Sequence, residues 1–496
     1  MHAPARSSSV LLSLAALAMP LGAVEHLTVL GDSLTKEYQV TFPGLPGLVD
    51  GIDATNPSAR NWAEILHERR NAHFDLGLFK NALFDRWSDL RLLGHEYNWA
   101  VPGATARALR NLVTNQNLGE ITSDPGFTTL TAFAPDWAQT SARLTAQVQT
   151  TAAAAVIWCG GNDLRYGNTD PSCLVGGTRI SYDTIYDGDG TGAGNPQPLM
   201  DSMRASIQAM ALHLQDSQPG LPIAVCAVPH VGCTPAVQAG SPTDAVRTGR
   251  ITTALRTLNA GLRTWTEQTL GGVWVDTESL TVDLIEAGSL IYGGVTFFNG
   301  PDVKALADPP SAHNRYLFSH DGFHPGTTLH AIVSQRVQAA LRARSPAVFS
   351  SSPALTDREV IVTVLGLPAD TGFAEFMAAS GAPADQRGPA DDPDGDGLTN
   401  VAEFALAGNV PFPDGPLSLP TGGLEAATSS VTLSWQPRFE SNIYASITCQ
   451  SSPDFTTWTD VPAGHITTAP DGVKTARVPA GEASRLFLRL KFTTVP

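Results

Sequence analysis

Four short apolar runs in this sequence favour β-strands. They are Thr28–Leu30, Ala153–Trp158, Pro222–Cys226 and Val273–Val275. Amphipathic helical patterns lie between and after them, as in Ile251–Leu262 and Leu329–Leu341. Strands that are apolar on both faces and alternate with helices are typical of a parallel sheet covered by helices on both sides. The sequence therefore predicts an α/β fold, a three-layer sandwich with a mainly parallel sheet.

The chain has 496 residues, which is too long for one typical domain. From about Pro416 the apolar pattern changes to period two, which predicts a small C-terminal all-β sandwich. Two stretches rich in Ser, Pro, Ala and Asp, Ser350–Pro353 and Ala382–Pro393, are interpreted as linkers around a short helix near Phe373–Phe376. We predict a signal peptide over 1–23, an α/β domain over 24–345, a linker region over 346–410 and a β domain over 411–496.

The first 23 residues have the features of a secretory signal peptide. Arg6 precedes an apolar run, Val10–Met19, and small residues follow at Gly22 and Ala23. A buried first helix is the alternative interpretation. No later segment is long and apolar enough for a membrane span. We therefore expect a secreted or periplasmic protein without an integral membrane segment.

The charge balance disfavours nucleic acid and anionic membrane surfaces as partners. There are 31 Lys and Arg residues against 47 Asp and Glu residues, a formal net charge of −16. The five cysteines show no metal-binding spacing, and Cys159 and Cys226 lie in apolar runs typical of a core. A Cys173–Cys233 disulfide is an alternative that the sequence does not decide. The Gly-rich block Asp187–Gly194 is interpreted as a flexible insertion.

Four short blocks carry residues suited to acyl transfer, and each is expected where a strand ends. They are Gly31–Leu34, Asn98–Ala104, Gly160–Asp163 and Asp321–Pro325. Ester cleavage needs an activated hydroxyl, a base and donors aimed at the developing oxyanion. Ser33 offers the hydroxyl and His324 the base, and Asp321 is spaced to orient that imidazole.

In this order, the four blocks resemble the GDSL (SGNH) esterase/lipase family over roughly residues 24–345. The resemblance implies Ser33 as nucleophile with His324 and Asp321 as its partners. It also implies an oxyanion hole made by the backbone N–H groups of Ser33 and Gly103 and the side-chain amide of Asn162. No cofactor is implied for catalysis.

Each assignment has a plainer alternative. Asp32 and Ser33 would serve as caps of a helix that follows them. His313, His320 and His330 are other candidates for the base that the sequence assigns to His324. Asn162 and Gly103 would serve only to shape turns. Asp163 and Asn98 are expected to brace loops by hydrogen bonds. The motifs of rival enzyme classes, such as Gly-x-Ser-x-Gly and His-Glu-x-x-His, do not occur.

A second motif lies in the tail, over residues 392–403. Oxygen ligands fall at the positions of an EF-hand loop, with glycine at the sixth position. The expected ligands are Asp392, Asp394, Asp396, the carbonyl of Leu398, Asn400 and Glu403. Because the preceding segment is a poor helix, the loop more nearly resembles the single calcium loops of dockerin-like or thrombospondin type 3 modules. We expect a structural calcium ion, and a solvated acidic linker is the alternative.

These observations predict a secreted serine esterase of the GDSL type, acting on small carboxylic esters and, in a lipase-like or phospholipase-like case, on acyl lipids. An acetylated polysaccharide is the alternative substrate, and a non-catalytic surface-binding protein on the same fold is the alternative function. Trp435, Tyr444, Phe455 and Trp458 are interpreted as core of the β domain, with a sugar-binding platform as the alternative.

Overall fold

The computed structural model describes residues 25–38, 56, 58–80, 87, 89–91, 93–122, 124, 127, 136–164, 174–175, 178–179, 197–240, 245–406, 419–439, 442–481 and 485–495. The predicted signal peptide, Cys173 and the Asp187–Gly194 insertion lie outside these residues. No helix in these ranges combines the length and the apolar character that a bilayer crossing requires.

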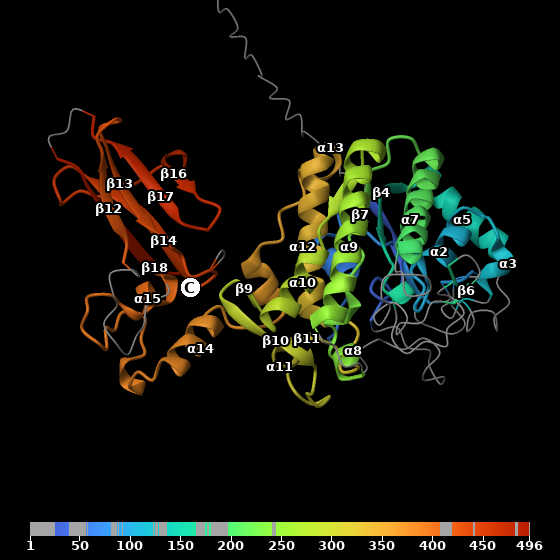
Figure 1. Cartoon of the computed structure of the whole chain (residues 1–496), viewed down its shortest axis with the longest axis horizontal. Helices are drawn as coiled ribbons and strands as arrows, with labels where there is room; N and C mark the ends of the chain where they lie inside the picture. Colours follow the sequence, from blue (N-terminus) through green and yellow to red (C-terminus); the bar gives the residue numbers. More distant parts are fainter. Residues whose placement is uncertain are drawn as a thin grey trace, which may run out of the picture.

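A four-stranded parallel sheet forms the centre of the first part of the molecule (Figure 1). Its strands are β1 (His26–Gly31), β4 (Ala152–Trp158), β7 (Ile223–Cys226) and β8 (Val273–Val275), in the order β1-β4-β7-β8. Residues 97–101 continue the hydrogen bonding on the other side of β1, since Val29 N donates to Tyr97 O and Trp99 N to Val29 O. The predicted strands are confirmed.

Alternate residues of these strands enter two different apolar cores. Leu30, Ile157 and Val225 belong to one core, whereas Val29, Val156 and Ala224 belong to the other. The first core is completed by α2 (Ala106–Val113), α5 (Trp137–Thr150), α7 (Gln197–Ser217) and α9 (Ala245–Trp265). The second is completed by α1 (Trp62–Arg70) and α12 (Thr327–Arg344). Because side chains alternate across a strand, both faces are covered, and the predicted three-layer sandwich is confirmed.

A second, smaller sheet was not predicted. It consists of β9 (Ser289–Tyr292), β10 (Val295–Pro301) and β11 (Tyr316–Phe318), and it follows α10 (Glu278–Ala287). The short elements of this part are β2 (Phe79–Lys80), β3 (Gly94–His95), α3 (Leu118–Ile121), η1 (Asn162–Leu164), β5 (Leu174–Val175), β6 (Thr178–Arg179), η3 (Val231–Cys233), α8 (Pro235–Gly240), η4 (Thr266–Leu270) and α11 (Pro310–His313). The sheet of β9, β10 and β11 matters for function because β11 leads directly into the Asp321–His324 loop.

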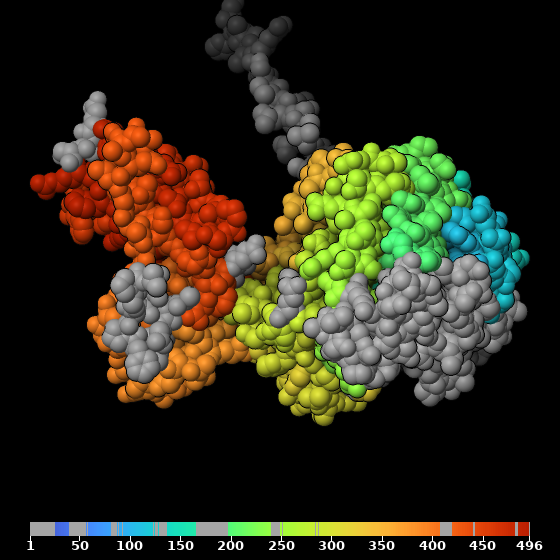
Figure 2. All heavy atoms as spheres, in the orientation of Figure 1, coloured from blue at the N-terminus to red at the C-terminus, as the bar shows by residue number. Residues whose placement is uncertain are grey.

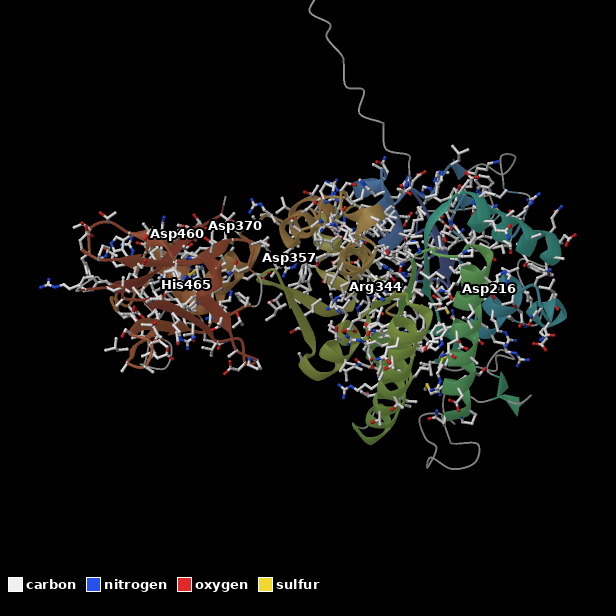
Figure 3. The ribbon with its side chains drawn as sticks, turned by 90° about the horizontal axis from the view of Figure 1, so that it is seen from above. Asp216, Arg344, Asp357, Asp370, Asp460 and His465 are labelled. Atoms are coloured by element: carbon white, nitrogen blue, oxygen red, sulfur yellow. The ribbon has the colours of Figure 1, made fainter. Side chains whose placement is uncertain are left out.

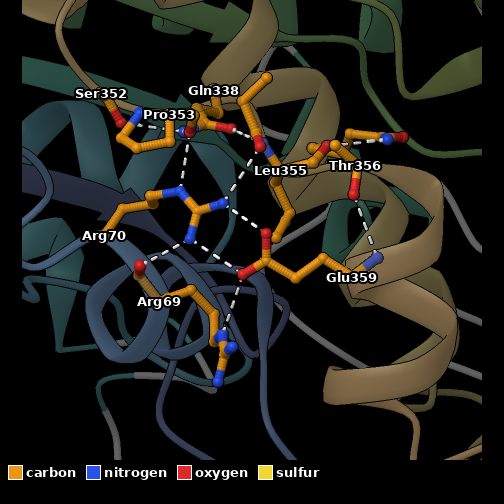
Figure 4. Close-up of polar contacts among 10 residues, drawn as sticks. Arg69, Arg70, Gln338, Ser352, Pro353, Leu355, Thr356 and Glu359 are labelled. Carbon is orange, nitrogen blue, oxygen red and sulfur yellow. Dashed lines mark hydrogen bonds and ion pairs between the residues drawn. The ribbon is translucent and has the colours of Figure 1, made fainter.

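The stretch after α12, which includes the predicted linker Ser350–Pro353, contacts the α/β part. Phe349 of α13 (Pro346–Phe349) stacks on Phe74 with ring centroids 4.9 Å apart, and Ser352 is fully buried. Figure 4 shows the polar side of this contact, where Arg70 donates to the carbonyl of Pro353 and pairs with Glu359 of η5 (Glu359–Val364). Within the stretch only Ser352 is buried, whereas Ser350, Ser351 and Pro353 are exposed.

The remaining chain forms a helical segment and a β sandwich, drawn in orange and red in Figure 1. The predicted helical piece is α14 (Thr371–Ser380), and it is followed by η6 (Ala384–Gln386) and α15 (Asn400–Leu406). Two antiparallel sheets follow. One contains β12 (Thr421–Glu425), β13 (Ser430–Trp435), β17 (Lys474–Pro479) and β16 (Ile466–Thr468). The other contains β15 (Thr459–Asp460), β14 (Ala445–Ser452) and β18 (Phe487–Thr494), and η7 (Ala463–His465) lies between β15 and β16.

Residues from both of these sheets share one core, which confirms the predicted C-terminal sandwich. Leu433 and Trp435 of β13 pack with Cys449 of β14 and Ala476 of β17. The view in Figure 3 labels Asp460 and His465 on this sandwich and Asp216 and Arg344 on the α/β part. Among the four aromatic residues assigned to the core, Trp435 is buried but Phe455 is 64% exposed, so the core assignment of Phe455 is wrong.

The two parts contact each other at the β9–β10 turn. Ile443 N donates to Gly293 O at 3.2 Å, and Arg358 donates to the carbonyls of Ile443 and Val495. Figure 2 shows an open gap between the orange-red C-terminal part and the yellow-green part of the α/β region.

Candidate active site

Ser33 lies in a tight turn directly after β1. Leu34 N donates to Asp32 Oδ1 at 2.9 Å, and Thr35 N and Lys36 N donate to Asp32 O. The sequence suggested that a helix starts after Ser33, but the structure has a turn there. The side chain and the carbonyl of Asp32 accept the backbone N–H groups of Leu34, Thr35 and Lys36. The turn holds Ser33 at the carboxyl edge of the sheet, where open α/β sheets bind ligands.

His324 is held by a closed loop between β11 and α12. Ser319 N donates to His324 O at 2.8 Å, and Gly322 N donates to Ser319 O at 2.8 Å. Asp321 Oδ1 accepts the backbone N–H groups of Phe323 and His324 at 2.8 and 3.0 Å. These bonds orient the Asp321 carboxylate and the His324 ring relative to each other before any substrate is present.

The two segments bring a carboxylate, an imidazole and a hydroxyl into one hydrogen-bonded chain. Asp321 Oδ2 lies 2.5 Å from His324 Nδ1, and His324 Nε2 lies 2.9 Å from Ser33 Oγ. Burial raises the pKa of Asp321, but hydrogen bonds and charge from His324 outweigh burial and lower that pKa to about 2. Asp321 is therefore an ionised partner for the imidazole at neutral pH, as activation of a serine hydroxyl requires.

The residues expected to form the oxyanion hole lie on adjoining loops. Asn162 begins η1 just after β4 and is buried, and its Nδ2 donates to the carbonyl of Ala104 at 3.1 Å. Gly103 precedes Ala104 and has φ +79°, a conformation that favours glycine. Val101 N donates to Gly31 O at 2.9 Å, which holds the Gly103 loop beside the Ser33 turn. The structure thus gathers Ser33, Asn162 and the Gly103 loop at one edge of the sheet.

Asn98 and Asp163 brace these loops, as expected from the sequence. Asn98 Nδ2 donates to Thr35 O at 2.9 Å, and Asn98 Oδ1 accepts Ala100 N. Asp163 Oδ2 accepts Ala106 N at the start of α2 at 3.0 Å. The bonds join the loops after β1, after residues 97–101 and after β4 into one rigid unit.

Comparison with known proteins agrees with this arrangement. The profile of the GDSL-like lipases and acylhydrolases matches residues 27–337. The chain belongs to the GDSL-like lipase/acylhydrolase family. No curated protein sequence matches the chain.

Two solved structures are similar to this GDSL-family chain. One is an acetyl esterase mutant with an acetate ion, at 10% identity, covering 65% of this chain and 99% of that one with a TM-score of 0.29. The other is an extracellular lipase from Streptomyces rimosus, at 14% identity, covering 62% and 99% with a TM-score of 0.27. The family assignment rests on the profile match.

The other histidines considered from the sequence have different contacts. His313 pairs with Asp302, with Nδ1 2.6 Å from Oδ2. His330 is buried in α12, where its Nε2 lies 2.6 Å from the hydroxyl of Tyr38, and that hydroxyl also lies 2.9 Å from Pro325 O. Burial lowers the pKa of His330 to about 3. Sequence reasoning missed the Tyr38–His330 pair, because nothing in the local pattern links residues 292 positions apart.

A hollow of about 610 Å³, including its open side, adjoins Ser33. It lies at the carboxyl edge of the sheet and is lined by Trp158 of β4, by the segments that follow the four strands, and by α10 and α12. Asp32, Ser33 and Asn162 line it together with apolar side chains that include Leu280 and Val333. Sequence reasoning did not identify this lining, because its members look like ordinary core residues.

Asp32 is a buried acid beside the proposed nucleophile. Its Oδ2 is buried without a hydrogen-bond partner, and it adjoins the hollow. Burial raises the pKa of Asp32 to about 7, against the opposing effects of the Leu34 N–H and His324. The same cause raises the pKa of Asp163 to about 7. The site therefore holds two carboxyl groups whose ionisation is costly.

The acidic loop in the tail gathers three carboxylates. Oxygens of Asp392, Asp394 and Asp396 all lie within 4.8 Å of one another. Asp394 Oδ2 and Asn400 Oδ1 are buried without hydrogen-bond partners. Burial and the neighbouring carboxylates of Asp392 and Asp396 raise the pKa of Asp394. Three carboxylates gathered in this way suit a hard cation such as calcium, although Asp392 and Asp396 are exposed.

Proposed function

We propose that this protein is a serine ester hydrolase that cleaves carboxylic esters through an acyl-enzyme on Ser33. The observation that carries the proposal is the continuous chain of hydrogen bonds from Asp321 through His324 to Ser33. Membership of the GDSL-like lipase/acylhydrolase family supports the same reaction class.

In the first step, Ser33 Oγ attacks the ester carbonyl carbon and its proton passes to His324 Nε2. The negative charge of ionised Asp321 stabilises the imidazolium that forms. The carbonyl oxygen becomes an oxyanion, and its donors would be the N–H groups of Ser33 and Gly103 and the amide of Asn162. The bond from Asn162 to Ala104 O fixes the plane of that amide, which keeps its orientation constant during the reaction.

In the second step, the imidazolium returns its proton to the leaving alcohol oxygen as the C–O bond breaks. An acyl-enzyme remains on Ser33. His324 then takes a proton from water, the hydroxide attacks the acyl carbon, and the acid is released while Ser33 regains its proton.

Hydrolysis of p-nitrophenyl esters tests the proposal. We expect turnover of p-nitrophenyl acetate or butyrate by the wild type and a loss of about 10³-fold or more in Ser33→Ala. Ser350→Ala is the matched control, because Ser350 is an exposed serine outside the site. If wild type and Ser33→Ala are equally inert toward a panel of acyl lengths, the esterase proposal is refuted.

We further propose that the protein is exported, with residues 1–23 removed. The support is the sequence pattern of Arg6 followed by the apolar run to Met19. N-terminal sequencing of protein from the culture medium or periplasm tests this, with an expected start near Val24. Retention of Met1 on cell-associated protein would refute it.

A structural calcium ion in the 392–403 loop is our third proposal. Asp392, Asp394 and Asp396 would hold it with the Leu398 carbonyl, Asn400 and Glu403, and the ion would offset the repulsion among these carboxylates. We expect EDTA to lower the melting temperature of the wild type and Asp394→Asn to reduce the metal content. Asp385→Asn, at an exposed acid of the same tail, is the control. Absence of metal by elemental analysis, with no EDTA effect, would refute this proposal.

A further inference from the structure

The hollow beside Ser33 is walled mostly by apolar side chains that come from several elements. Its wall includes Leu280 of α10 and Leu329 and Val333 of α12, all of which are buried. Phe318 and Phe323 contribute from β11 and the His324 loop.

The polar side chains of the wall use their hydrogen-bonding groups on the protein. The hydroxyls of Thr234, Thr277 and Thr281 donate to the carbonyls of Val231, Ala227 and Glu278 at 2.8 to 2.9 Å. Each threonine hydroxyl therefore has a protein partner, and the wall they help to form is predominantly apolar.

The two nitrogen-bearing rings of the wall are engaged in the same way. Trp158 Nε1 donates to Ala227 O at 3.2 Å. His230 Nδ1 accepts Gly232 N, and its Nε2 lies 3.0 Å from Thr252 Oγ1. The lining thus concentrates its polarity at Asp32, Ser33 and Asn162, the residues nearest the proposed reaction. A sugar, which needs many donors and acceptors, does not match such a wall.

We infer that this hollow binds the acyl chain of the substrate, and that the preferred esters carry acyl groups of medium length rather than acetyl. The inference rests on the proposed function, because it places the ester carbonyl at Ser33. The acyl group is the part that stays on Ser33 after the alcohol leaves, so a pocket that includes Ser33 and extends into the core suits this part. The alcohol leaves toward the open side.

Each methylene buried in an apolar pocket contributes enough free energy to raise kcat/KM about fourfold. From acetate to hexanoate we therefore expect a gain of at least about tenfold in the wild type. A parallel series with acetyl esters of lengthening alcohols distinguishes the two halves of the substrate. This second series should stay within about threefold, because the alcohol portion does not enter the hollow.

Filling the hollow tests the location of the acyl chain. Thr281 is partly exposed on α10 and lines the hollow, so Thr281→Trp places an indole in the space. We expect the hexanoate-to-acetate ratio of kcat/KM to fall about tenfold. Thr257→Trp is the matched control, since Thr257 is an exposed threonine of α9 whose hydroxyl also bonds a helix carbonyl. The ratio should be unchanged there.

The outcomes separate this inference from the proposed function. If Ser33→Ala abolishes turnover but the acyl series is flat or falls with length, the function stands and the acyl pocket is refuted. An equal ratio in Thr281→Trp and Thr257→Trp also refutes it. Should Thr281→Trp fail to fold, inhibition of the wild type decides: hexanoate must inhibit at least about tenfold more strongly than acetate, and equal inhibition overturns the inference.

Discussion

His324 Nε2 lies 2.9 Å from Ser33 Oγ, although 291 positions separate the two residues in the chain. The contact depends on the β11–α12 loop reaching the carboxyl edge of the parallel sheet. The imidazole is already in position to accept the serine proton without rearrangement.

Replacing Asp321 by Asn should lower kcat by roughly 10³–10⁴-fold with little change in KM. The amide cannot stabilise the imidazolium, and it disturbs the tautomer of His324. Kinetics with p-nitrophenyl butyrate measure the effect, and Asp308→Asn, an exposed acid before α11, is the control. Equal kcat in the two variants would remove Asp321 from the mechanism.

The raised pKa of the buried Asp32 carboxyl group predicts a specific pH dependence of stability. Because burial raises its pKa from 3.8 to about 7, the folded state binds the proton more tightly than the unfolded chain. The unfolded chain loses the Asp32 proton near pH 4, whereas the folded protein keeps it until about pH 7. The free energy of unfolding therefore falls as the pH rises from about 4 to about 7. The melting temperature of Asp32→Asn relative to wild type should rise over this interval and stay constant above it. The exposed control Asp471→Asn should show no such rise, and a difference independent of pH would contradict the prediction.

Tyr38→Phe should lower the free energy of unfolding by about 1–3 kcal/mol. Its hydroxyl contacts both Pro325 O and His330 Nε2, and its removal leaves buried polar atoms without that partner. Because Pro325 follows His324, kcat should also fall, by less than in Asp321→Asn. Urea unfolding and ester kinetics measure the two effects. Tyr316→Phe, at a partly exposed tyrosine of β11, is expected to change neither.

Glu359→Gln should weaken the attachment of the post-α12 segment to α1. Hydrogen bonds and charge from Arg70 lower the pKa of Glu359, so its contribution to stability is present above about pH 4.5 and is lost as the pH falls. At pH 7 we expect a loss of about 1–3 kcal/mol in the free energy of unfolding, shrinking toward pH 3. Glu68→Gln, at a more exposed acid paired with Arg60, should cost no more than about 0.5 kcal/mol. Equal losses in both variants would contradict this account.

Local pattern predicted the main strands and the choice among histidines. Strands apolar on both faces can only be buried between layers, and the spacing of Asp321 from His324 is short enough for a local hydrogen-bonded loop. The turn after Ser33 was missed because Asp32 uses its side chain to satisfy backbone donors that a helix would otherwise satisfy. The β9–β11 sheet was missed because β9 is only partly buried and lacks the continuous apolar run of a central strand.

The amino-acid sequence by itself determined the layered α/β core, the C-terminal sandwich and the residue types available for acyl transfer. These depend on apolar periodicity and on motifs within a few residues. The Ser33–His324 contact, the Tyr38–His330 pair and the apolar hollow were decided only by the tertiary structure. Each depends on packing between segments that are far apart in the chain. Ser33 and His324 lie in motifs that mark them in the sequence, whereas Tyr38, His330 and the apolar side chains around the hollow look like ordinary core residues.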